Sequence, residues 1–130
     1  MKFPKMIALL LSIPFFALWA MAQNPTEDLT DNLVKVKSKW GEPCTPCNAL
    51  SDTTYVAYYK SKSPKNLDVM IGVRERGGWW RLATFYGVTP ADTMRVFGCK
   101  GTGKTLKWAR YANDPSFKFP TQSEVNEQYK

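Results

Sequence analysis

The chain contains no histidine and only three cysteines among its 130 residues. The absence of histidine excludes a histidine-dependent catalytic triad or dyad and a histidine-ligated metal. Covalent haem attachment is excluded as well, because the residue after Cys47 is Asn48, where that motif requires histidine. Three cysteines without a histidine or a fourth cysteine make a poor zinc site. We therefore expect neither a metal nor a cofactor.

The first 22 residues have the features of a secretory signal peptide. Lys2 and Lys5 precede the apolar run Met6–Trp19, and Ala20–Ala22 forms a small-x-small cleavage site. The run is short for a membrane-spanning helix, so we expect cleavage rather than retention as an anchor. The sequence thus predicts an exported protein, periplasmic or secreted, in a compartment where disulfides persist. Its predicted parts are a signal peptide (1–22), a polar N-terminal lead (23–32) and a single domain (33–130).

Acidic residues are also scarce, with 11 Asp and Glu against 18 Lys and Arg. A solvated basic face explains this excess, and the alternative is an anionic partner such as a membrane surface, a cell-wall polymer or an acidic protein. An exported protein has little access to intracellular nucleic acid, so we expect no nucleic-acid partner. We also expect no stable membrane insertion after signal cleavage. Much of the basic excess comes from Lys35, Lys37, Lys39, Lys60, Lys62 and Lys65.

Strand-like patterns recur along the chain. Leu33–Trp40 alternates apolar or small residues with lysines, which predicts a strand with one basic face, and Leu67–Val73 reads as a second strand. The next segment allows a Gly77-Gly78 hairpin into a strand over 79–85, or a loop and a short helix over 79–86. Met94–Phe97 and Leu106–Tyr111 form a predicted strand pair, and a helix is expected from Thr121 or Ser123 to Tyr129.

Residues 48–63 decide between two fold classes. Leu50, Thr54, Ala57 and Tyr58 lie at helical spacing, yet Thr53–Tyr59 has the composition of a strand. A helix here fits an α/β fold. A strand fits a small mostly-β barrel or sandwich, in which residues 53–60 would pair with residues 67–73.

Two of the cysteines form a Cys-x-x-Cys motif in the stretch Trp40-Gly41-Glu42-Pro43-Cys44-Thr45-Pro46-Cys47. At a strand-to-helix junction, the helix N-terminus would stabilise a Cys44 thiolate, and Cys47 could attack a mixed disulfide. If these two cysteines pair, Cys99 is left over and predicts a disulfide-linked dimer. The alternative is a structural disulfide between Cys99 and one of them.

The motif, its Pro46 and the later stretch Tyr86-Gly87-Val88-Thr89-Pro90 make residues 33–130 resemble the thioredoxin superfamily. The resemblance implies an α/β fold, a central mixed β-sheet flanked by helices. It implies a thiol–disulfide oxidoreductase that acts on protein thiols and disulfides. Its site residues would be the nucleophile Cys44, the resolving Cys47, and the substrate-binding Trp40, Pro43, Pro46 and Pro90.

Two other functions remain open. One is a non-catalytic, β-rich secreted binding or inhibitor domain with structural cysteines, in which Trp79, Trp80 and the lysines form the contact surface. On a strand, the two tryptophans would point in opposite directions, so one would be exposed. The other is a thioredoxin-like subunit that binds partners without activity, since Ser38 stands where classical thioredoxins carry a buried acid.

The stretch Gly98–Thr105 matches the phosphate-loop pattern G-x-x-x-x-G-K-[ST]. A nucleotide-binding domain needs a long βαβ sheet after the loop, and too few residues follow. We therefore expect a glycine-rich hairpin at this place.

Overall fold

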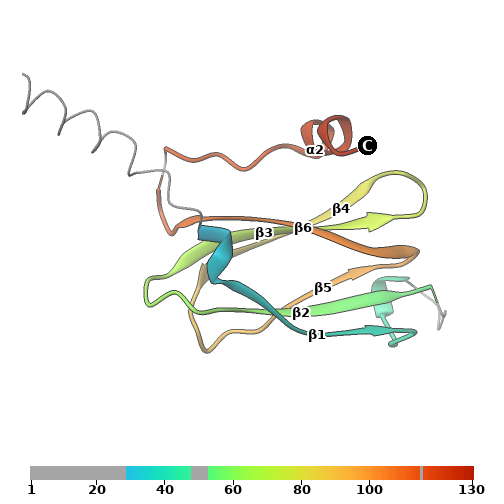
Figure 1. The fold of residues 1–130 in the computed structure, drawn as a ribbon, viewed down its shortest axis with the longest axis horizontal. Helices are drawn as coiled ribbons and strands as arrows, with labels where there is room; N and C mark the ends of the chain where they lie inside the picture. Colours follow the sequence, from blue (N-terminus) through green and yellow to red (C-terminus); the bar gives the residue numbers. More distant parts are fainter. Residues whose placement is uncertain (1–28, 48–52, 115) are drawn as a thin grey trace, which may run out of the picture.

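The structure, a computed structural model, describes residues 29–47, 53–114 and 116–130. These residues form two three-stranded antiparallel sheets, with strand orders β1-β2-β5 and β4-β3-β6 (Figure 1). The elements are η1 (Leu29–Asn32), β1 (Leu33–Trp40), η2 (Thr45–Cys47), β2 (Tyr55–Ser61), β3 (Leu67–Glu75), β4 (Trp80–Val88), β5 (Met94–Gly98), β6 (Gly101–Tyr111) and α2 (Gln122–Gln128).

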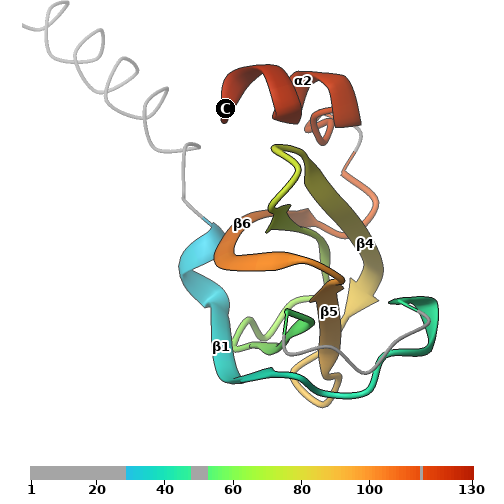
Figure 2. The ribbon, with the colours of Figure 1, turned by 90° about the vertical axis from the view of Figure 1, so that its right-hand side faces the viewer.

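The molecule has three layers. The two sheets face each other, and α2 covers the outer face of the β4-β3-β6 sheet (Figures 1 and 2). The inter-sheet core contains, among others, Leu33, Tyr55, Ala57, Tyr59, Met94 and Val96 from one sheet, and Leu67, Val69, Ile71, Val73, Val88 and Ala109 from the other. The α/β thioredoxin-like prediction is therefore wrong, and the alternative of a small β-rich fold describes the chain.

Strand β3 lies at the centre of this arrangement. Val69, Ile71 and Val73 point into the inter-sheet core, while Met70 packs on the other side with Trp80. Burial on both faces explains why this strand is a nearly continuous apolar run. Each large aliphatic side chain buried in this way contributes about 1.5–3 kcal/mol to folding.

The β3–β4 connection is a hairpin, as one of the two interpretations predicts. The N–H of Glu75 donates to the carbonyl of Trp79 at 2.9 Å, and Gly78 occupies the turn with φ +89°. Glycine adopts this left-handed conformation without steric cost. The alternative helix over 79–86 is wrong, because those residues lie almost entirely in β4.

The segment after residue 53 is a strand and not the helix that the thioredoxin resemblance requires. Tyr55, Ala57 and Tyr59 alternate into the core, and this period of two outweighs the helical spacing. The predicted partner of this strand is wrong, because β2 pairs with β1 and β5 instead of β3. The part of the predicted helix over 48–52 lies outside the described residues.

Strands β5 and β6 do not form the predicted pair. The Cys99-Lys100 turn carries the chain from one sheet to the other, so β5 pairs with β2 and β6 pairs with β3. A Cβ atom on Gly98 would lie 2.7 Å from Val73 Cγ1, and one on Gly101 would lie 2.7 Å from Tyr55 Cβ. The glycines of the phosphate-loop-like stretch thus permit close packing where the chain crosses between the sheets.

The predicted strand β1 is confirmed with its exact bounds, but its lysines do not share one face. An irregularity in pairing between Lys35 and Lys37 shifts the register. Lys35 pairs opposite Tyr59 and donates to the Tyr55 hydroxyl at 3.1 Å, whereas Lys37 lies over the ring of Tyr58. The predicted signal peptide and most of the N-terminal lead lie outside the described residues.

Candidate functional site

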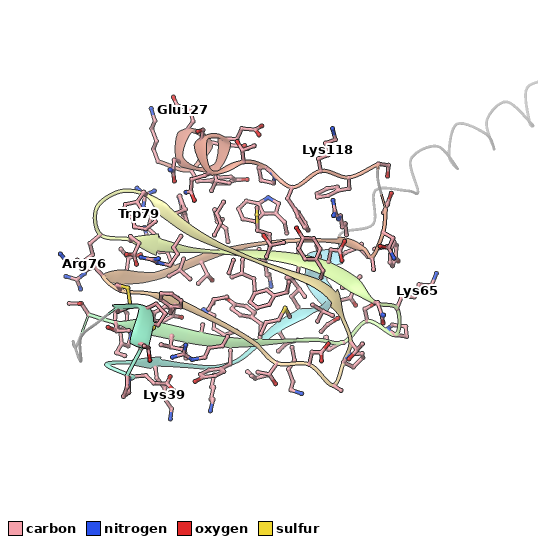
Figure 3. All side chains as sticks on the ribbon, turned by 180° about the vertical axis from the view of Figure 1, so that it is seen from behind. Lys39, Lys65, Arg76, Trp79, Lys118 and Glu127 are labelled. Atoms are coloured by element: carbon pink, nitrogen blue, oxygen red, sulfur yellow. A yellow bond between two sulfur atoms is a disulfide. The ribbon has the colours of Figure 1, made fainter. Side chains whose placement is uncertain are left out.

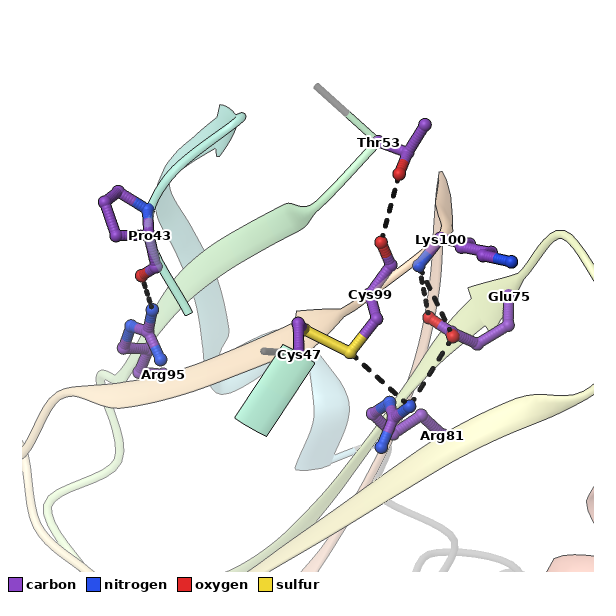
Figure 4. Close-up of a disulfide and its surroundings, with 8 residues drawn as sticks. All are labelled: Pro43, Cys47, Thr53, Glu75, Arg81, Arg95, Cys99 and Lys100. Carbon is purple, nitrogen blue, oxygen red and sulfur yellow. Dashed lines mark hydrogen bonds and ion pairs between the residues drawn. A yellow bond between two sulfur atoms is a disulfide. The ribbon is translucent and has the colours of Figure 1, made fainter. Parts of the chain in front are cut away.

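Cys47 forms a disulfide with Cys99, 52 positions later in the sequence (Figure 4). The bond joins the short η2 helix to the turn between β5 and β6. In the chain-entropy description, closing a loop of this length stabilises the folded state by about 4 kcal/mol. This is the structural pairing that the sequence leaves open, and it occupies the cysteine expected to resolve a mixed disulfide.

Cys44 is the free cysteine, and it is only 4% exposed. It precedes η2, and its carbonyl accepts the N–H of Cys47 at 3.0 Å. The long helix N-terminus expected beside this thiol is absent from the described residues, where a single 3₁₀ turn follows. The arrangement therefore lacks the exposed thiol that attack on a protein disulfide requires.

A buried carboxylate lies beside the disulfide. Glu75 is 4% exposed, and its two carboxylate oxygens accept the backbone N–H of Lys100 at 3.3 and 3.5 Å. Arg81 Nη2 forms an ion pair with Glu75 Oε2 at 3.6 Å and donates to Cys99 Sγ at 3.7 Å (Figure 4). A carboxylate buried to this degree requires such partners, because its desolvation is otherwise costly.

The Arg81 guanidinium also lies over two aromatic rings. Its Cζ atom is 4.9 Å from the ring centroid of Trp79 and 5.0 Å from that of Phe97. Its Nε is buried and has no hydrogen-bond partner among the described residues. Trp79 is 39% exposed, and Figure 3 places it beside Arg76 at one end of the sandwich. Contacts of this kind fix the orientation of an arginine while leaving hydrogen-bond donors unused.

The second arginine near the disulfide segment, Arg95, lies on β5 of the other sheet. Its Nη2 donates to the carbonyl of Pro43 at 3.2 Å, and its Nε donates to the Tyr58 hydroxyl oxygen at 3.4 Å. The Tyr58 hydroxyl in turn donates to Glu42 Oε1 at 2.6 Å. Hydrogen bonding to Tyr58 raises the pKa of the Arg95 guanidinium, with the Cys44 thiol as a further partner. The hydrogen bonds to Pro43 and Tyr58 hold the Arg95 guanidinium in place.

These two arginines line one open pocket of about 150 Å³ between the free edges of β4 and β5. The two strands lie side by side in Figure 2. The carboxylates of Glu42 and Glu75 do not line it. Its walls are Arg81, Leu82, Ala83, Arg95, Val96 and Phe97.

The structure separates the residues that the resemblance groups into one site. Pro43 and Pro46 are exposed near Cys47, and Trp40 is 50% exposed against the ring of Tyr55. Pro90 lies in the turn between β4 and β5, at the opposite end of β5 from Cys99. A shared substrate surface formed by Pro90 and the cysteines is therefore not present.

The prediction that one of Trp79 and Trp80 is exposed is confirmed, since Trp79 is 39% exposed and Trp80 only 5%. Sequence reasoning missed Glu75, Arg81 and Arg95. Glu75 could have been noticed in the sequence, because it is an acidic residue at the end of an otherwise apolar strand. Arg81 and Arg95 could not have been found in this way, since their place in one pocket depends on how the two sheets pack together.

Among the described residues, no group of three or more cysteine or acidic side chains could hold a metal ion, and no helix is long and apolar enough to cross a membrane. Comparisons with protein-family models, with curated proteins and with solved structures find no match for this chain. The candidate site therefore rests on its own geometry.

Proposed function

We propose that this chain is an exported, non-catalytic β-sandwich domain that binds an acidic side chain of a partner peptide in the Arg81–Arg95 pocket. One observation carries the proposal: two arginines from edge strands of different sheets line the same open pocket. The placement of the cysteines supports a non-catalytic role, because Cys47 is bonded to Cys99 and Cys44 is buried.

The chemistry of the pocket favours a carboxylate. Guanidinium groups present planar donors that match the two oxygens of a carboxylate, and such charge-assisted bonds are stronger than neutral ones. Arg81 keeps 32% of its side-chain surface exposed, whereas the Glu75 side chain keeps 5%. The positive charge of the pair is thus the part that an incoming anion meets.

The size of the pocket favours one side chain over a whole small molecule. Sites for drug-sized ligands enclose about 300–1,000 Å³, and this pocket holds about 150 Å³. Leu82, Ala83 and Phe97 supply apolar walls for the stem of a glutamate. The edges of β4 and β5 run along the pocket, so an extended peptide can follow them while its acidic side chain enters.

A peptide titration followed by ¹⁵N NMR tests the proposal. The probe is the capped peptide Thr-Val-Glu-Val-Thr, and its control carries Gln in place of Glu. We expect the Glu peptide to shift the amides of residues 81–83 and 95–97, and the Gln peptide to bind at least tenfold more weakly, because a charge-assisted bond contributes about 1.5–3 kcal/mol. Shifts confined to the lysines of β1 would contradict the pocket.

Two variants sharpen the titration. Arg95→Glu reverses an exposed charge in the pocket, and we expect it to weaken binding at least tenfold. Arg76→Glu makes the same change in the β3–β4 turn, outside the pocket, and should leave affinity within about twofold. An insulin-reduction assay of the same protein should give no turnover, and turnover that is lost in Cys44→Ser would overturn the non-catalytic role.

A further inference from the structure

Cys44 and Cys47 lie in one 3₁₀ turn, which the Cys47 N–H closes on the Cys44 carbonyl at 3.0 Å. A turn closed by an i to i+3 hydrogen bond keeps its two end Cα atoms within about 7 Å, close to the Cα separation that a disulfide spans. A bond from Cys44 to Cys47, which pairs with Cys99 in this structure, is therefore within reach of the turn. Cys44 is a free thiol three residues before Cys47, and it is buried.

An arginine lies near the sulfur of Cys99, and another near the sulfur of Cys44. Arg81 Nη2 donates to Cys99 Sγ at 3.7 Å. At the other end, Arg95 takes the Cys44 thiol as a hydrogen-bond and charge partner, after Tyr58. A neighbouring guanidinium favours a departing thiolate, and Arg81 lies beside the leaving sulfur of Cys99.

We infer that Cys44 exchanges with the Cys47–Cys99 disulfide, and that this exchange regulates the Arg81–Arg95 pocket; the second part rests on the proposed function. The Cys44 thiol loses its proton and attacks Cys47 Sγ, so that a Cys44–Cys47 bond forms as the Cys47–Cys99 bond breaks. Cys99 leaves as a thiolate beside Arg81 and then takes up a proton. One disulfide and one thiol are present before and after, so no external oxidant or reductant is consumed.

The exchange removes a covalent constraint near the pocket. The Cys47–Cys99 bond ties η2 and the preceding segment to the end of β5, and that segment supplies the Pro43 carbonyl that fixes Arg95. After exchange, the covalent tie is a short loop within the segment and no longer reaches β5. The pocket then loses a constraint on one of its two arginines, which weakens binding of a carboxylate.

Trapping of the released thiol tests the exchange directly. The folded protein is incubated with iodoacetamide at pH 8, denatured, and digested with trypsin without reduction. Cleavage after Lys39 and Lys60 leaves Cys44 and Cys47 in one peptide, and cleavage after Arg95 and Lys100 leaves Cys99 in another. We expect the two peptides to begin linked, and the 40–60 peptide to gain an internal disulfide while alkylated 96–100 accumulates. Alkylation of Cys44 alone, with Cys99 never released, overturns the inference.

Variants separate exchange from general opening of the fold. Cys44→Ser removes the attacking thiol and should abolish the release of Cys99. Arg81→Gln removes the cation beside the leaving sulfur and should slow release about threefold. Arg81→Lys keeps the charge and should restore most of the rate. A purely structural role of Arg81 would have the opposite sign, because loss of its ion pair with Glu75 would loosen the fold and speed the release of Cys99. Arg76→Gln, the matched control, should have no effect, and equal rates in Arg81→Gln and Arg76→Gln contradict the assignment of Arg81.

The regulatory part has its own readout. Cys99→Ser leaves only Cys44 and Cys47 to pair, whereas Cys44→Ser keeps the Cys47–Cys99 bond. We expect the Cys99→Ser protein to bind the Glu peptide at least threefold more weakly than the Cys44→Ser protein. Binding to Cys44→Ser without any release of Cys99 in the wild-type protein would refute the exchange and leave the proposed function standing. Release of Cys99 without peptide binding by either form would refute the proposed function instead.

Discussion

The indole nitrogen of Trp80 donates a hydrogen bond to the backbone carbonyl of Tyr129 at 2.8 Å. Their rings also meet edge to face, with centroids 6.5 Å apart. This contact joins the first residue of β4 to the end of α2, so it holds the third layer of the molecule on the sheet. Arg74 Nη1 donates to the same carbonyl at 2.9 Å.

Replacing this indole tests how much the contact contributes. Trp80→Phe removes the donor and part of the buried ring, and Arg74 still satisfies the carbonyl of Tyr129. We therefore expect a loss of about 1–2 kcal/mol in the free energy of unfolding, measured by urea denaturation. Trp79→Phe is the matched control, because Trp79 is exposed, and it should stay within about 0.5 kcal/mol. Equal losses in the two variants would contradict the role of Trp80.

The crossing between the sheets leaves no room for a side chain at Gly98. A Cβ atom there would lie 2.6 Å from Glu75 Oε1 and 2.7 Å from Val73 Cγ1, both in the packed interior. We expect Gly98→Ala to cost about 1–3 kcal/mol by overpacking, again by urea denaturation. Gly77→Ala meets only the Trp79 side chain, at 3.2 Å, and should cost less. A neutral Gly98→Ala would show that the crossing is wider than described.

How much the sequence predicts depends on whether the pattern is local. Three predictions depend on neighbouring residues and are confirmed: the strand over Leu33–Trp40, the apolar run of β3 and the Gly77-Gly78 turn. The single basic face expected of the first strand is wrong, because the register shifts between Lys35 and Lys37. The predicted helix is wrong over residues 55–61, which form β2, because pairing with β1 and β5 outweighs the local helical spacing. The pairing of β5 with β6 is wrong because the choice of a partner strand is a long-range property.

The candidate site illustrates the same limit. The cysteines are visible in the sequence, but which of them pair depends on where η2 and the β5–β6 turn meet. Arg81 and Arg95 lie on strands of different sheets, and only the closure of the sandwich brings both to one pocket. The spacing of these two arginines along the chain does not predict that they line the same pocket.

The buried carboxylate of Glu75 makes the stability of the protein sensitive to Arg81. Arg81→Gln leaves Glu75 with only the backbone N–H of Lys100, so we expect a loss of about 2–3 kcal/mol, less than for a fully buried pair because Arg81 is partly exposed. Adding Glu75→Gln removes the uncompensated charge, and the double variant should recover part of that loss. A double-mutant cycle by urea denaturation measures the coupling, and strict additivity would exclude an interaction between the two side chains.

The N-terminus of α2 predicts a specific titration. Thr121 caps the helix by accepting the N–H of Glu124 at 3.3 Å, while the Glu124 carboxylate accepts the N–H of Thr121 at 3.1 Å. This hydrogen bond from the Thr121 backbone lowers the pKa of Glu124 below its ordinary value. A lowered pKa in the folded state means that the contribution to stability is present above the ordinary pKa and is lost as the pH falls through the lowered one.

NMR titration of the Glu124 side chain measures that shift directly. In Thr121→Ala the side-chain acceptor is lost and the box loosens, so the pKa of Glu124 should move back toward its ordinary value. Ser123→Ala changes the neighbouring hydroxyl outside the box and should leave the pKa unchanged. An ordinary pKa for Glu124 in the wild-type protein would mean that the box does not form in solution.

The disulfide should dominate the stability of the whole sandwich. Cys47→Ser removes the cross-link between η2 and the β5–β6 turn. We therefore expect the free energy of unfolding to fall by nearly the loop-closure value of about 4 kcal/mol. Cys99→Ser should cost less than this, because Cys44 and Cys47 can still close a short loop. Cys44→Ser keeps the cross-link and loses only a buried thiol, for which about 1 kcal/mol is expected. Urea denaturation of the three variants therefore gives a ranked series, and a Cys44→Ser protein as unstable as Cys47→Ser would show that Cys44, and not Cys99, is the partner of Cys47.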